Sequence, residues 1–89
     1  MQVQEDTVSD VVKRLRRAEG QIRGVIGMLE DGRDCAEVVT QLSAASRALD
    51  RAGFKIIASG LQQCLTAKNS GEDQAANLEQ MQKLFLSLA

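Results

Sequence analysis

The sequence predicts an all-α protein, a three-helix protomer with a long central helix. Its 89 residues suit a single domain that spans residues 1–89. Proline is absent and only two residues are aromatic, which disfavours a β-sandwich and fits long helices. Apolar residues also recur at helical spacing in three segments, which glycine-containing turns separate.

The first predicted helix has Thr7 or Ser9 as its N-terminal cap and ends at Gly32. Its apolar residues follow a seven-residue repeat, as in a coiled coil. The repeat comprises Val8, Leu15, Ile22 and Leu29. Three glycines lie within this helix, and each costs about 1 kcal/mol relative to alanine. We therefore expect another helix to approach closely at Gly20, Gly24 and Gly27.

The second predicted helix is capped by Asp34 and runs to about Thr66 without a helix-breaking residue. Its length of roughly 48 Å exceeds the width of a globule of this size. Because it also carries an apolar stripe, we expect it to pack against another chain, so the protein is expected to form homo-oligomers. A turn at Lys68–Gly71 follows, in which Ser70 resembles the first residue of a capping box.

A third, shorter helix is predicted after this turn. Its apolar stripe comprises Leu78, Met81, Leu84, Phe85 and Leu88.

The composition excludes several classes of function. Histidine is absent, which removes the usual general base of a hydrolase and the commonest metal ligand. We therefore expect neither an enzyme nor a cofactor. No run of about 18 apolar residues could span a membrane, and the acidic N-terminus is unlike a signal peptide. A cytoplasmic location, where thiols stay reduced, is the expectation.

Two cysteines lie near the two ends of the second helix. Cys35 and Cys64 are about 43 Å apart on an unbroken helix, too far for a disulfide within one chain. Their separation of eight turns and about 20° places both thiols on one face, the inward one. If two copies pack antiparallel, Cys35 of one chain meets Cys64 of the other, twice per dimer.

In that arrangement the two cysteines would have different roles. Cys35, at the positive end of the helix dipole, would attack an electrophilic sulfur species, and Cys64 of the partner would resolve the adduct. The alternative is that both are inert, small apolar residues of the core.

Basic residues form stripes on the first two helices. Arg47, Arg51 and Lys55 recur every four residues on the face away from the cysteines. Symmetric copies would combine these stripes into a positive surface for DNA phosphates, although the net charge is −1. The alternative is a solvated helix face. No helix-turn-helix or zinc finger is evident. The first-helix candidates are Arg14, Arg16 and Arg17.

Four segments together resemble the CsoR/RcnR-type bacterial repressors over residues 8 to about 66. They are Arg14–Val25 (RLRRAEGQIRGV), Asp34–Cys35 with Val38–Ala44 (VVTQLSA), Leu49–Ala52 (LDRA) and Cys64, near the end of the second predicted helix. The resemblance implies an antiparallel dimer that assembles into a dimer-of-dimers tetramer. It also implies binding to operator DNA through the first two helices, with Arg14 and Arg51 as the strongest contact candidates.

One position decides which branch of the family the chain resembles. Copper-sensing members carry a histidine four residues before the second cysteine, whereas this chain has Gly60. A cysteine pair without that histidine is similar to the persulfide-sensing CstR branch. The resemblance then implies a repressor released when reactive sulfur species link Cys35 to Cys64 of the adjoining chain as a di- or polysulfide. The alternative is a Cu(I)-responsive repressor that uses the same two thiolates. A helical adaptor with inert cysteines and no role at DNA is a third hypothesis.

Overall fold

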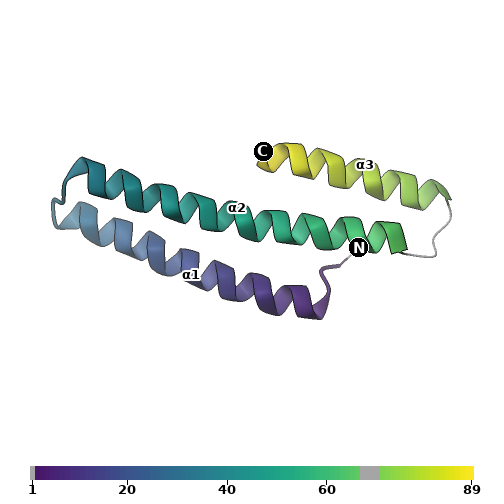
Figure 1. Cartoon of the computed structure of the whole chain (residues 1–89), viewed down its shortest axis with the longest axis horizontal. Helices are drawn as coiled ribbons and strands as arrows, with labels where there is room; N and C mark the ends of the chain where they lie inside the picture. The colour runs from purple at the N-terminus through teal and green to yellow at the C-terminus, as the bar shows by residue number, and fades with distance from the viewer. Residues whose placement is uncertain (1, 67–70) are drawn as a thin grey trace.

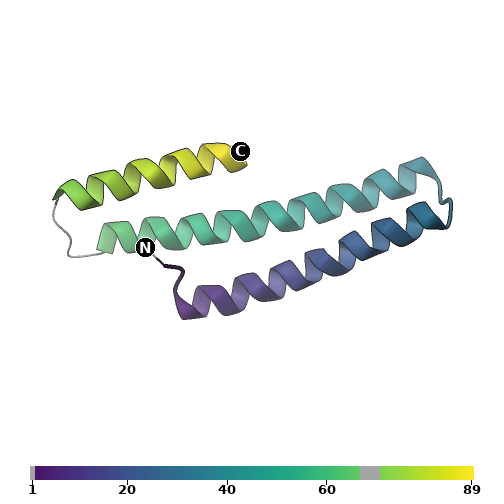
Figure 2. The ribbon, with the colours of Figure 1, turned by 180° about the vertical axis from the view of Figure 1, so that it is seen from behind.

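The computed structural model describes residues 2–66 and 71–89, and these form three helices. They are α1 (Glu5–Glu30), α2 (Cys35–Thr66) and α3 (Gly71–Leu88). Helices α1 and α2 lie side by side as an antiparallel pair, and α3 folds back along the C-terminal half of α2 (Figure 1 and, from behind, Figure 2). The prediction of an all-α protomer with a long central helix is confirmed.

The protomer is a flat, elongated plate. It measures 57 × 24 × 13 Å and has a radius of gyration of 17.1 Å. A compact domain of this length would have a radius of gyration of about 12 Å. Such a thin shape leaves much apolar surface uncovered within one chain. In the described part of the chain, no helix is both long and apolar enough to cross a membrane.

The start of α1 differs from the prediction. The helix begins at Glu5, and the Val8 amide donates to the Gln4 carbonyl at 2.8 Å. Thr7, expected as a cap, already lies inside the first turn, and its amide donates to Asp6 Oδ1 at 2.9 Å. Acidic residues at the positive end of the helix dipole favour this earlier start. The prediction of a cap at Thr7 or Ser9 is therefore wrong.

The end of α1 and the start of α2 are as predicted. Gly32 adopts a left-handed conformation with φ of 69°. The Arg33 amide donates to the Met28 carbonyl at 2.9 Å and the Gly32 amide to the Leu29 carbonyl at 3.2 Å, which is the Schellman pattern. Of the predicted turn at Lys68–Gly71, residues 68–70 with the cap Ser70 lie outside the described residues, and Gly71 is the first residue of α3.

The core between α1 and α2 uses small residues at seven-residue spacing. On α1 the buried residues are Val11, Ala18 and Val25, and on α2 they include Val38, Ala45 and Ala52. Alanines at this seam allow the two helix backbones to approach closely.

The predicted repeat of α1 lies on another face. Val8, Leu15, Ile22 and Leu29 are 39–62% exposed in the protomer. Helix α1 thus has two apolar stripes, and α2 covers the one made of smaller residues. Within the protomer, α2 therefore leaves the predicted coiled-coil-like repeat uncovered.

Close approach of a helix occurs at a glycine other than those predicted. A Cβ on Gly53 of α2 would lie 2.6 Å from Leu88 Cδ1 of α3. A Cβ on Gly20 or Gly27 would have no described atom within 4 Å, and on Gly24 it would have only Gln41 Nε2, at 3.8 Å. Within the protomer the expected approach at the α1 glycines is therefore absent from the described residues.

Candidate functional site

Four arginines surround one groove between α1 and α2. Its volume is about 250 Å³, and the small side chains of Ala44 and Ala48 leave room for it. The arginine groove, as we call it, is lined by Arg14, Arg17 and Gln21 of α1 and by Ala44, Arg47, Ala48 and Arg51 of α2. The spacings of three and four residues place each set on one helix face.

The other two predicted basic residues lie elsewhere. Lys55 Nζ forms an ion pair of 3.1 Å with Asp10, which also pairs with Arg14 at 3.3 Å. The hydrogen bonds from Lys55 and then Arg14 hold the pKa of the Asp10 carboxyl below its ordinary value of 3.8. Arg16 lies beside a separate depression with Val12, Leu15 and Glu19. The structure thus brings together four of the six candidates.

Three of the four arginines in the groove lack a counter-ion. Among the described residues, Arg17, Arg47 and Arg51 form no ion pair within 4 Å. Sequence reasoning also missed Gln21, whose Oε1 atom is buried without a hydrogen-bond partner in the described residues. Gln21 lies seven residues after Arg14, and this helical spacing already indicates that the two side chains share one face of the helix. As far as the structure describes the chain, the groove therefore presents positive charge without a paired carboxylate beside the unbonded Gln21 Oε1 atom.

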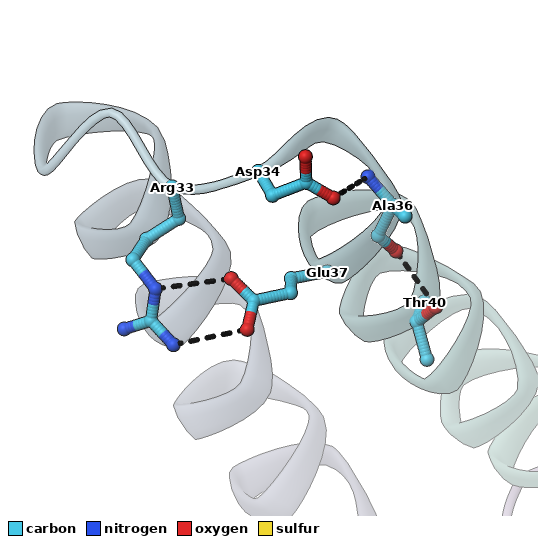
Figure 3. Close-up of polar contacts among 5 residues, drawn as sticks. All are labelled: Arg33, Asp34, Ala36, Glu37 and Thr40. Carbon is cyan, nitrogen blue, oxygen red and sulfur yellow. Dashed lines mark hydrogen bonds and ion pairs between the residues drawn. The ribbon is translucent and has the colours of Figure 1, made fainter.

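Cys35 is the first residue of α2. Figure 3 shows the polar contacts of the residues around it in this first turn. The Ala36 amide donates to Asp34 Oδ2 at 3.1 Å, which confirms the predicted cap. Arg33 donates to both carboxylate oxygens of Glu37 at 3.1 and 3.4 Å, and Thr40 Oγ1 donates to the Ala36 carbonyl at 2.7 Å. These bonds fix the backbone that carries the Cys35 side chain, which is exposed.

Cys64 lies in a different environment at the other end of α2. Its side chain is 1% exposed and belongs to a buried cluster with Ile57 and with Met81 of α3. Neither cysteine forms a disulfide among the described residues. The prediction that both thiols face inward is wrong for Cys35 within the protomer, because α3 covers only the C-terminal half of α2 (Figure 1).

One protomer does not gather a metal site from the usual ligands. The described residues contain no group of three or more His, Cys, Asp and Glu side chains placed to hold a metal ion. The thiols are soft donors that suit Cu(I), whereas histidine, the usual nitrogen ligand of Ni(II), is absent from the sequence. A shared site would need donors from a second copy.

Comparison with known proteins places the chain in a family. A family model described as a metal-sensitive transcriptional repressor matches residues 7–87. The copper-sensing transcriptional repressor RicR of Mycobacterium tuberculosis is 43% identical over 54 residues, which is 61% of this chain and 56% of RicR. The copper-sensing transcriptional repressor CsoR of Bacillus subtilis is 31% identical over 67 residues, 74% of this chain and 66% of CsoR.

A solved structure agrees with this assignment. The nickel-responsive transcriptional regulator InrS superposes with a TM-score of 0.79 at 28% identity, covering 100% of this chain and 98% of InrS. The chain spans 56–66% of the length of the two curated relatives described above. These relatives are named as copper and nickel sensors, not as sensors of reactive sulfur. The chain belongs to the CsoR/RcnR family of metal-sensitive transcriptional repressors, and it is not an enzyme.

Proposed function

We propose that this protein represses transcription by binding operator DNA through the arginine groove, and that Cu(I) bound by Cys64 of one protomer and Cys35 of a second releases it. The observation that carries the DNA contact is the convergence of four arginines in one groove, three of which form no ion pair with another described residue. Guanidinium groups bind phosphate oxygens in a bidentate geometry, so the groove suits the DNA backbone.

A second copy of the chain is needed for the cysteine site. The exposed apolar residues of α1 and α2 form a surface that a soluble monomer rarely leaves open. They include Val8, Leu15, Ile22 and Leu29 of α1 and Val39, Leu42 and Leu49 of α2. In an antiparallel dimer about this surface, Cys35 of one α2 lies near Cys64 of the other. Two such dimers form the proposed tetramer.

The choice of Cu(I) as effector is supported by the relatives and by the donor chemistry. RicR and CsoR are named as copper-sensing repressors. Thiolates are the ligands that Cu(I) prefers, and when bound the ion links donor atoms of two chains. Both cysteines lie on α2, the helix that also carries Arg47 and Arg51. A shift of α2 against its partner therefore changes the spacing of the grooves on the two protomers.

Reactive sulfur species are the second candidate effector. The chain has no histidine, and Gly60 occupies the position where copper-sensing members carry one. In this chemistry the exposed Cys35 thiolate attacks a polysulfide and takes up one sulfur, with a shorter polysulfide as leaving group. The partner's Cys64 then attacks the bound Cys35 sulfur and expels hydrosulfide, so two thiols are oxidised while one sulfane sulfur is reduced.

Two measurements on the intact oligomer decide between the effectors. Cu(I) titration against a tight chelator, followed by DNA-binding assays, should show tight binding and loss of operator affinity. Polysulfide treatment followed by non-reducing mass spectrometry should leave the chains unlinked. A Cys35–Cys64 dimer linked by a di- or polysulfide, together with weak Cu(I) binding, would favour the second candidate. If the wild-type protein does not bind its own promoter DNA at low salt, the result would instead favour the adaptor hypothesis.

A further inference from the structure

A methionine from α3 lies in the same buried cluster as Cys64. Met81 is 5% exposed and Cys64 is 1% exposed, and the two belong to one cluster with Ile57. The cluster joins α2 to α3, and Leu61 and Leu78 pack against it. Two sulfur-bearing side chains from different helices thus share one buried cluster.

A cavity opens on Met81 from the side of the N-terminal segment. Its volume is about 270 Å³, and Met81, Gly60 and Gln63 contribute to its walls. Gly60 has no side chain, so the α2 wall at this point is backbone, which leaves room beside Met81. Gln63 Nε2 donates to the Gln2 carbonyl at 2.8 Å and holds the N-terminal segment against the cavity. Met81 therefore borders unfilled space rather than a fully packed core on every side.

The chemistry of these donors selects a soft monovalent ion. A thioether is neutral at every pH and binds Cu(I) well, whereas Zn(II) and Ni(II) sites favour nitrogen or thiolate ligands. Cys64 supplies one thiolate, and a second chain supplies Cys35 in the proposed function. Met81 would add a third sulfur without adding charge, in place of the imidazole that this chain lacks.

We propose that the Met81 thioether is a Cu(I) ligand together with the Cys64 thiolate, so that each shared site receives two sulfurs from one protomer and Cys35 from its partner. This inference rests on the proposed function. It has a mechanical consequence, since a ligand on α3 and another on α2 would fasten the two helices together when the ion binds. Amide exchange in α3 should then slow on addition of Cu(I).

Selenomethionine labelling tests the ligand directly in the unaltered fold. Cu(I)-loaded, selenomethionine-labelled protein should show a copper–selenium path by X-ray absorption at both edges. The path should vanish in Met81→Leu, a swap of similar volume, and persist in Met28→Leu, whose site is on α1. Met81→Leu should also weaken Cu(I) binding by about tenfold or more in chelator competition, with Met28→Leu unchanged.

The outcomes separate this inference from the proposed function. Wild-type protein without tight Cu(I) binding overturns the proposed function and the inference together. Tight binding without a copper–selenium path, and equal affinity in Met81→Leu, overturns the role of Met81 alone. Should Met81→Leu fail to fold, a labelled wild-type spectrum without a copper–selenium path still overturns the role of Met81.

Discussion

Replacement of Arg51 by alanine tests the arginine groove most sharply. The Arg51 side chain is exposed and forms no ion pair among the described residues. Substitutions of this kind usually change stability by less than about 0.5 kcal/mol. A loss of DNA binding in Arg51→Ala would therefore report on the contact with DNA rather than on folding.

The expected magnitude follows from counterion release. Each phosphate that a basic residue neutralises contributes about 0.9 to the slope of log affinity against log salt concentration. If two protomers contact the operator, Arg51→Ala should reduce the magnitude of that slope by about 1.8. Arg47→Ala should behave alike, because both residues line the same groove.

Fluorescence anisotropy with labelled promoter DNA at several salt concentrations gives this slope. Arg33→Ala is the matched control, because Arg33 lies in the turn between α1 and α2, outside the arginine groove, and already pairs with Glu37. The control should keep the wild-type slope. An unchanged slope in Arg51→Ala, or an equal loss in Arg33→Ala, would refute the reasoning.

Three further predictions concern the fold. The pKa of Asp10 lies below its ordinary value of 3.8, so its ion pair with Lys55 stabilises the protein above that pH and is lost as the pH falls through the lowered pKa. Lys55→Met should raise the pH midpoint of the Asp10 carboxyl titration measured by NMR. An unchanged midpoint would contradict the pairing. Gly53→Ala should speed amide exchange in the last turn of α3 by displacing Leu88, and Leu88→Ala should relieve the clash; unchanged exchange would rule out the close contact. Gly20→Ala should raise the free energy of unfolding by up to about 1 kcal/mol, because a Cβ at this position meets no described atom within 4 Å. A lower melting temperature would contradict this prediction and would show that another chain packs on this face.

Local signals in the sequence were enough to predict the helices and two of their ends. The Schellman turn at Gly32 and the cap at Asp34 depend on residues adjacent in the chain. The buried seam of α1 could not be chosen in the same way, because this helix has two apolar stripes at seven-residue spacing. Packing against α2 selects the stripe of smaller residues, and only the tertiary structure reveals that choice.

The candidate site was predictable to a similar degree. The spacing of Arg47 and Arg51 predicts a common face, and both residues line the arginine groove. Lys55 continues the spacing, yet Asp10 of α1 pairs with it across the helix interface. Met81 could not be linked to Cys64 beforehand, because their proximity depends on α3 folding back along α2. The spacing of residues within one helix does not determine the contacts between helices.

The claim that the cysteine site is shared between chains is tested most directly by mixing two variants. Cys35→Ala and Cys64→Ala protomers each lack one donor, so neither homodimer should bind Cu(I) tightly. In a random mixture, half of the dimers contain both chains and hold one intact site of two, so about one quarter of the wild-type capacity should return. If the mixture binds no more Cu(I) than the separate variants, the donors are not shared and the account is contradicted.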